Sequence, residues 1–199
     1  MKQLVLATNN KNKIEELKIM LQGLTVEVLT LDAFPGFSPV DEDAETLEGN
    51  ALKKAQEIHR LTKLPAVADD SGLEVGYLNR APGVHTSRFA GEHASYEENW
   101  KKLLHDMLGV PARRRGARFR CVLAFVAPGT EETVEGICPG KITENPRGKN
   151  GFGYDPVFQP TGYATTLAEM NTDLKNALSH RGLATAAMKP ILQHYFSRS

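Results

Sequence analysis

Ala68-Asp69-Asp70-Ser71-Gly72 follows a short apolar run at residues 64–67 and precedes a second one at residues 73–75. The pattern predicts a strand that runs into a turn, with two carboxylates and a hydroxyl at the turn. Adjacent aspartates repel each other and resist burial unless a positive charge lies beside them. A divalent cation such as Mg²⁺, which prefers carboxylate oxygens, would meet that need. A solvated turn is the alternative, because Asp-Ser-Gly is ordinary turn chemistry.

The charges of the chain balance, with 24 Lys and Arg against 24 Asp and Glu in 199 residues. We therefore expect neither nucleic acid nor a membrane surface as a partner, and a polyanion would need a local cluster. No signal peptide and no apolar run long enough for a bilayer is recognisable. The two cysteines, Cys121 and Cys138, form no disulfide framework or metal-ligand spacing, which predicts a reducing compartment, the cytoplasm.

A polar hexapeptide, Thr8-Asn9-Asn10-Lys11-Asn12-Lys13, follows the apolar strand expected at residues 3–7. Apolar residues then repeat at helical spacing from Ile14 to Leu21, so the hexapeptide joins a strand to a helix. A helix start presents free backbone N–H groups and the positive end of the helix dipole, which suits phosphate. The segment does not match the Walker pattern. An ordinary connection with solvated lysines is the alternative.

An acidic stretch, Asp41-Glu42-Asp43-Ala44-Glu45, follows a strand expected at residues 25–29 and precedes a helix with an apolar face at residues 51–58. Acidic residues are common before and in a first helical turn, so capping is one interpretation. The other is that one of these carboxylates joins Asp70 on a metal ion. Glu16, on the first helix, is a weaker candidate for the same role.

The middle of the chain predicts scaffold elements. Residues 95–108 form an amphipathic helix, and the strands at 117–127 and 133–138 form an antiparallel hairpin with a cysteine packed in each. The basic run Arg113-Arg114-Arg115 falls in a loop, where we expect a solvated turn rather than a nucleic-acid patch.

Glycines and aromatics gather at residues 148–156, where a loop would let the backbone approach a ligand closely. Phe152 or Tyr154 could stack on a flat ring, and Asp155 could accept hydrogen bonds from ring N–H groups. A glycine-rich turn with an aromatic side chain in the core is the alternative.

The last helix is expected to begin after Ser179, a good N-cap, and to be kinked or divided at Pro190. His180 and Arg181 then occupy its first turn. Cations are unfavourable there unless an anion or a polar ligand lies near. Their position is therefore a mild indication of function.

The chain resembles the inosine/xanthosine triphosphate pyrophosphatase family, the Ham1-like nucleotidases. Four motifs carry the resemblance, in the family's order and with similar spacing from Leu4 to beyond Arg181: the hexapeptide 8–13, Ala68-Asp69-Asp70-Ser71-Gly72, Gly151-Phe152-Gly153-Tyr154-Asp155 and Ser179-His180-Arg181.

Three positions depart from the family's pattern. Gly49-Asn50-Ala51 stands where the family usually has Glu-Asn-Ala, and Glu42-Asp43-Ala44 stands where it usually has Glu-any-Gly. Lys149 replaces a small residue. The metal-binding carboxylate stays open between Asp41, Glu42 and Asp43, and Glu42 fits the motif register best.

The resemblance implies an α/β fold with a long, twisted, mixed central sheet, flanking helices and two lobes with an active-site cleft. It implies one domain over residues 1–199 and a homodimer. The implied reaction is hydrolysis of ITP, dITP or XTP to the monophosphate and pyrophosphate.

The resemblance also assigns roles at the phosphate end of such a substrate. Asp70 and Glu42 would hold Mg²⁺, and Asp70 would be the general base for the attacking water. The hexapeptide 8–13, Ser71 and Lys175 would hold the phosphates.

At the base end, Phe152 would stack on the purine, in a loop with Gly153 and Tyr154. Asp155, His180 and Arg181 would read the edge of the base. Arginine has only donors, so Arg181 would match the 6-carbonyl of inosine and xanthosine and oppose the amino group of adenosine. Pairing of Arg181 with a carboxylate is the alternative.

Three other functions compete with this interpretation. A Maf-like pyrophosphatase acting on other modified nucleotides is disfavoured by the Ser-His-Arg triplet. A nucleotide-binding regulator without turnover gains little from paired carboxylates beside phosphate. Single-strand binding through Arg113–Arg115 conflicts with the neutral net charge.

Overall fold

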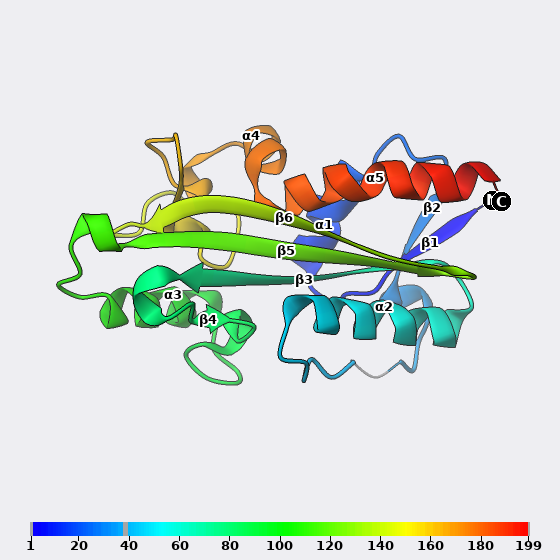
Figure 1. Cartoon of the computed structure of the whole chain (residues 1–199), viewed down its shortest axis with the longest axis horizontal. Coiled ribbons are helices and arrows are strands. Elements are labelled where there is room, and N and C mark those ends of the chain that lie inside the picture. Colours follow the sequence, from blue (N-terminus) through cyan, green and yellow to red (C-terminus); the bar gives the residue numbers. More distant parts are fainter. Residues whose placement is uncertain (1, 38–39, 199) are drawn as a thin grey trace. The chain divides into compact units, whose positions relative to one another are not determined.

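The computed structural model describes residues 2–37 and 40–198, and Figure 1 labels most of its helices and strands. The chain divides into two compact units, each built from several segments. The first unit holds Met1–Asp70, Cys121–Gly136 and Arg181–Ser199, and the second holds Ser71–Arg120 and Ile137–His180. The resemblance implied two lobes, and this division agrees with it.

The first unit is a mixed α/β layer around the strand β1 (Gln3–Leu6), whose apolar residues are mostly buried. β1 pairs in parallel with β2 (Glu27–Thr30) and with the start of β3 (Ala66–Val75). In the core of this unit, Leu4, Leu6 and Phe125 belong to one cluster with Leu17 and Val67 and with apolar residues of the last helix, such as Met188. The helices of this unit are α1 (Lys11–Met20), α2 (Leu47–Thr62) and α5 (His180–Arg198), with a 3-10 turn at Leu31–Ala33.

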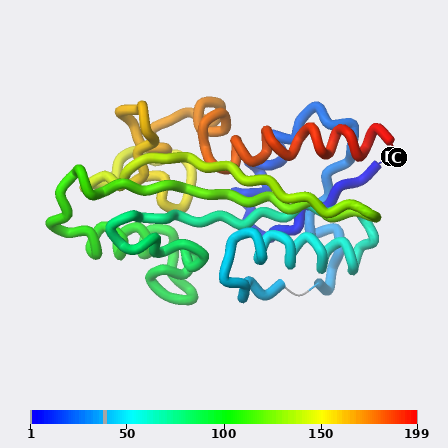
Figure 2. The backbone as a smooth tube through the Cα atoms, viewed as in Figure 1, coloured from blue at the N-terminus to red at the C-terminus, as the bar shows by residue number. Residues whose placement is uncertain are grey.

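The two ends of the described chain lie side by side in this unit, as the blue and red ends of the tube in Figure 2 show. The Lys2 ammonium donates a hydrogen bond to the backbone carbonyl of Phe196.

Two long strands, β5 (Gly116–Ala127) and β6 (Thr130–Ile142), are divided between the units, as β3 is. The second unit contains the part of β3 from Ser71 onward, the start of β5 and the end of β6. It also contains β4 (Pro82–Gly83) and β7 (Phe158–Pro160). Its helices are α3 (Tyr96–Asp106), which begins with a capping box of Ser95 and Glu98, and α4 (Thr172–Leu178). Shorter 3-10 turns occur at Gly76–Leu78, Thr86–Arg88, Ala112–Arg114, Asp155–Val157 and Leu167–Glu169.

The strand order is β2-β1-β3-β5-β6-β7, with β4 paired to β3, so β3, β5 and β6 supply residues to both units. Parallel pairs join β1 to its neighbours, and antiparallel pairs join β3 to β4 and β6 to β7. The expected α/β class with a mixed sheet is thereby confirmed. The expected hairpin is also confirmed, since β5 and β6 are sheet neighbours joined by two residues.

The turn expected at residues 68–72 is wrong, because β3 continues without interruption from Ala66 to Val75. Successive side chains of a strand point to opposite faces. Asp69 and Asp70 therefore project to opposite sides of β3, where each meets its own cations, and the backbone needs no turn to separate them.

Several boundaries also differ from expectation. α1 begins at Lys11, so half of the polar hexapeptide is helical, and β2 begins two residues later than expected. α5 runs through Pro190 without being divided. Arg115 is not solvated: its guanidinium is buried and donates to backbone carbonyls, including those of Ile142 and Thr143.

Both cysteines are free and buried in the sheet, as expected for small packed side chains. Within residues 2–37 and 40–198, none of the helices has the length and apolarity needed to cross a bilayer.

Candidate functional site

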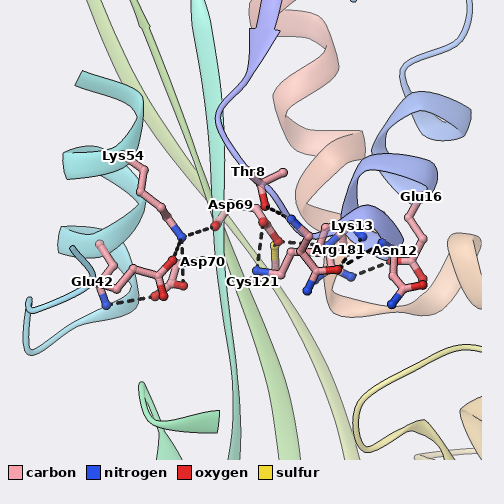
Figure 3. Close-up of polar contacts among 12 residues, drawn as sticks. Thr8, Asn12, Lys13, Glu16, Glu42, Lys54, Asp69, Asp70, Cys121 and Arg181 are labelled. Atoms are coloured by element: carbon pink, nitrogen blue, oxygen red, sulfur yellow. Dashed lines mark hydrogen bonds and ion pairs between the residues drawn. The ribbon is translucent and has the colours of Figure 1, made fainter. Parts of the chain in front are cut away.

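The first unit carries a cluster of two carboxylates around one buried lysine, shown in Figure 3. The Lys54 ammonium lies 2.5 Å from Glu42 Oε1 and 3.3 Å from Asp70 Oδ1. It also donates to the backbone carbonyl of Asp69 over 2.7 Å. Lys54 is only 7% exposed. Burial alone would lower its pKa, but the surrounding carboxylates outweigh burial and hold that pKa above its ordinary value, so the side chain stays charged.

Sequence reasoning missed Lys54, although the sequence contains a signal. The buried face of α2 consists of Leu47, Asn50, Ala51, Lys54, Ala55 and Ile58. Two polar residues one helical turn apart thus interrupt a stripe that is otherwise apolar. Buried polar groups need partners, so Asn50 and Lys54 could have been predicted to face a polar site.

Asn50 links the acidic stretch to Asp70. Its amide nitrogen donates to Asp70 Oδ2 over 3.2 Å, and its carbonyl oxygen accepts from the backbone N–H of Ala44 over 2.9 Å. Burial raises the pKa of Asp70, while the nearby lysines act to lower it. A carboxylate with a raised pKa is a better proton acceptor than an ordinary aspartate.

The three candidate acids of the stretch differ in their contacts. Glu42 shares Lys54 with Asp70, whereas Asp43 is exposed and pairs with Lys53 over 2.6 Å. Asp41 is exposed and lines a surface pocket with Lys53. Glu42 contacts the Lys54 ammonium that Asp70 also contacts, so the geometry favours Glu42 as the partner of Asp70.

Asp69 is the centre of a second charge network on the other side of β3 (Figure 3). Its Oδ1 lies 3.0 Å from Lys13 Nζ, and its Oδ2 lies 3.0 Å from Arg181 Nε. Arg181 also pairs with Glu16 over 2.6 Å. Asp69 is completely buried, which by itself would raise its pKa, but the cations outweigh burial and hold that pKa far below its usual range.

The hexapeptide forms the expected helix start. Asn10 is the N-cap of α1, and its side chain accepts from the backbone N–H groups of Asn12 and Lys13. The hydroxyl of Thr8 accepts from the N–H of Asn10 over 3.2 Å. Thr8 and Asn10 are half-buried, and Asn9 and Lys11 are exposed. The segment therefore combines an ordered backbone turn with one lysine held by Asp69 and one at the surface.

Most of the residues predicted for the base belong to the second unit, whereas Arg181 belongs to the first. Asp155 is 3% exposed and accepts from the Lys175 ammonium over 2.6 Å and from the N–H of Phe152 over 2.8 Å. Lys175 also lies 4.8 Å from the centre of the Phe152 ring. A Cβ at Gly151, whose φ is +73°, would collide with the Asp155 carboxylate, so this loop needs glycine there.

Lys175 was predicted to hold phosphate, but the structure places it with Asp155 and Phe152, the residues predicted for the purine. Tyr154 is buried in the core of the second unit, and its hydroxyl donates to the carbonyl of Thr86 over 3.0 Å. For Tyr154 the alternative of an aromatic tucked into the core therefore holds.

His180 is buried and stacks on Phe119, with ring centres 4.5 Å apart and planes 11° apart. Ser71 is half-buried on β3, and Gly153 has a positive φ of +63° in the loop after Phe152. The substrate contacts of these three residues stay predictions.

Arg181 is 2% exposed, and the two carboxylates that it contacts explain why a cation is tolerated in the first turn of α5. Pairing with a carboxylate was the alternative interpretation, and the structure shows this pairing. That Arg181 also reads the base stays a prediction. Glu16, a weaker metal candidate, is instead the partner of Arg181.

The described residues contain no group of three or more His, Cys, Asp and Glu side chains placed to hold a metal ion. A cation bound by Glu42 and Asp70 would take its remaining ligands from water and substrate, as Mg²⁺ commonly does.

The model of the Ham1 family matches residues 4–191 of the chain. A dITP/XTP pyrophosphatase of Geobacter sulfurreducens is 47% identical over 95% of this chain and 96% of its own length. A dITP/XTP pyrophosphatase of Desulforamulus reducens is 46% identical over 98% of this chain and 97% of its own.

Solved structures show the same likeness. A HAM1 protein from Coxiella burnetii superposes with a TM-score of 0.89 at 37% identity, covering 98% of this chain and all of that chain. A nucleoside-triphosphatase, dITP/XTP pyrophosphatase, from Mycobacterium abscessus superposes with a TM-score of 0.77 at 42% identity, covering 94% of this chain and 99% of that chain.

Proposed function

This chain belongs to the Ham1 family, and we propose on that basis that it hydrolyses non-standard purine nucleoside triphosphates such as dITP, ITP and XTP to the monophosphate and pyrophosphate. The relatives with 47% and 46% identity carry the name dITP/XTP pyrophosphatase and align with nearly the whole chain. The Maf-like alternative has no support among these relatives. That residues 1–199 act as one catalytic domain is part of the same proposal.

The observation that carries the proposal is the pair of carboxylates, Glu42 and Asp70, that share the Lys54 ammonium. Two carboxylates around one ammonium would be unfavourable in a site that binds phosphate without a metal ion, because their negative charges repel those of the phosphates. The arrangement suits a triphosphate that arrives with a metal ion.

We propose Mg²⁺ as that ion, held by Glu42 and Asp70. These residues fit a divalent cation, because both carboxylates already contact a single positive centre. When bound, Mg²⁺ would neutralise charge on the triphosphate and on the departing pyrophosphate.

The residues of the chain would divide the remaining work. The Asp70 carboxylate would take a proton from the water whose oxygen forms a bond to the α-phosphorus, while the bond from that phosphorus to the pyrophosphate oxygen breaks. The polar segment 8–13, which runs into the first turn of α1, would hold the phosphates together with Ser71, and Lys13 would supply positive charge.

Most of the residues proposed to bind the purine belong to the second unit. Phe152 offers a half-buried ring for stacking, and Asp155 and Lys175 supply an acceptor and donors beside it. His180 and Arg181 would read the edge of the base, as expected from the sequence. A homodimer and a cytoplasmic location complete the proposal, the latter supported by two free thiols.

The test is to incubate the protein with ITP, dITP, XTP, GTP and ATP in the presence of Mg²⁺ and to measure pyrophosphate and orthophosphate separately. We expect pyrophosphate from ITP, dITP and XTP, with little product from GTP and ATP. A modified pyrimidine triphosphate serves as the control for the Maf-like alternative. Release of orthophosphate alone, or equal turnover of all the nucleotides, would contradict the proposal.

A further inference from the structure

Asp69 has no role in the proposed reaction, although it is the most enclosed carboxylate of the charge networks in Figure 3. Asp70, its neighbour in sequence, projects to the opposite face of β3 and meets Lys54. Adjacent aspartates in one strand thus serve two separate clusters.

We propose that Asp69 is a positioning residue, whose buried carboxylate fixes the Lys13 ammonium for the phosphates of the substrate and does not itself take part in proton transfer. The proposal rests on the proposed function. It assigns Asp70 alone to the water and Asp69 to the lysine.

The Asp69 carboxylate is fully buried, and its two oxygens contact two different cations. Both oxygens of Asp69 have close partners, Lys13 Nζ at 3.0 Å from Oδ1 and Arg181 Nε at 3.0 Å from Oδ2. The Cys121 thiol lies 3.9 Å from Oδ2. With no exposed surface, this carboxylate has no open approach for a water molecule, which a general base requires.

Asp69 also belongs to a chain of four alternating charges. Lys13 and Glu16 lie three residues apart on α1, so they are neighbours on one face of that helix. Asp69 contacts Lys13, Arg181 contacts Asp69, and Glu16 contacts Arg181. The four charges therefore connect α1, β3 and α5, and each cation lies beside at least one acid.

Contact with Asp69 restricts the position of the Lys13 ammonium. A lysine has a flexible four-carbon stem, and an ammonium without a partner samples many positions. Lys13 lies in the first turn of α1, within the polar segment 8–13 that is proposed to hold phosphate. Its side chain is 15% exposed, against 0% for Asp69, so the cation reaches the surface while its anchor does not. Asp69 thus sets where the ammonium stands before substrate binds.

The experiment is a double-mutant cycle on the affinity for Mg²⁺-tripolyphosphate, a probe that has phosphates and no base, measured by calorimetry. The variants are Asp69→Asn, Lys13→Met and the two combined. We expect each single variant to weaken binding about tenfold or more, and the double variant to bind no more weakly than Lys13→Met. The cycle isolates coupling between two contacting residues. Losses that multiply in the double variant would overturn the proposal.

Glu16→Gln is the matched control, because it also removes a carboxylate from Arg181 but leaves the contact between Asp69 and Lys13. We expect its tripolyphosphate affinity to stay within about threefold of wild type. An equal loss in Glu16→Gln and Asp69→Asn would mean that the network acts only through overall charge balance, and would contradict a specific role in placing Lys13.

Two further measurements keep the result interpretable. If Asp69→Asn does not fold, Asp69→Glu takes its place in the cycle, because it keeps the charge and moves the carboxylate by one methylene; wild-type affinity in that variant would overturn the proposal. Hydrolysis of ITP by the wild type is measured separately. Absence of hydrolysis would refute the proposed function, whereas the binding cycle tests Asp69 without any turnover.

Discussion

Replacement of Lys54 by methionine tests whether this lysine balances the charge of the carboxylate cluster. Methionine keeps an unbranched side chain of nearly the same length and removes the ammonium that contacts Glu42, Asp70 and the Asp69 carbonyl. The contacts to Asp70 and to the carbonyl are buried, and removing one partner of a buried ion pair costs about 3–5 kcal/mol. For a chain of this size, about 2–4 °C of melting temperature corresponds to 1 kcal/mol, so we expect a drop of roughly 6–20 °C.

The assay is thermal melting followed by circular dichroism, with and without Mg²⁺. Because the variant leaves two acids without their shared lysine, Mg²⁺ should stabilise it more than it stabilises the wild type. Lys53→Met is the control: Lys53 and Asp43 are 42% and 72% exposed, and an exposed pair contributes about 0–1 kcal/mol. A Lys54→Met variant that melts within about 2 °C of wild type, or that Mg²⁺ does not stabilise further, would refute this account of the cluster.

Four further outcomes follow from the site. Asp70→Asn should keep the fold and lower kcat by about 10²–10⁴-fold or more, since it removes the base and one metal ligand; pyrophosphate release measures this, and a near-normal rate would assign the base elsewhere. Chelation by EDTA should abolish turnover and added Mg²⁺ should restore it, so full activity in EDTA would argue against the metal. Phe152→Ala should raise KM for ITP and leave tripolyphosphate binding unchanged, because its ring lies beside Lys175 and is not among the residues proposed for the phosphates; weakened tripolyphosphate binding would place Phe152 at the phosphates. Acid should destabilise the metal-free protein, prepared with EDTA, through Asp69. The pKa of Asp69 is lower in the folded than in the unfolded protein, so its contribution to folding stability is present above the unfolded pKa of about 3.9 and is lost as pH falls below that value toward the folded pKa. Urea midpoints between pH 7 and pH 3 check this, and Asp69→Asn should flatten the slope.

Local patterns were sufficient for many elements. The apolar run at the start of the chain, the helical repeat from Ile14 to Leu21 and the hairpin around Pro128 and Gly129 each predicted the right kind of element. The motifs carried the family, and the Ham1 model matches residues 4–191. Such features are readable because they depend on neighbours within a few residues, through periodicity, capping and turn chemistry.

Only the tertiary structure shows which cation each buried carboxylate contacts. The sequence placed Asp69 and Asp70 together and suggested a metal ion between them, but strand geometry sends them to opposite faces of β3. Asp69 meets Arg181 across 112 positions of sequence, and Asp70 meets Lys54 across 16. No local pattern encodes such pairs, because folding of β3 against α1, α2 and α5 decides which cation each carboxylate meets.

The sequence by itself determined the family, the fold class and the residues that gather as candidates for chemistry. The tertiary structure decided how those residues divide: Glu42 with Asp70 at Lys54, Asp69 with Lys13 and Arg181, and Lys175 with Asp155. The physical reason is that ion pairing depends on distance and burial in space, whereas a motif records only order along the chain.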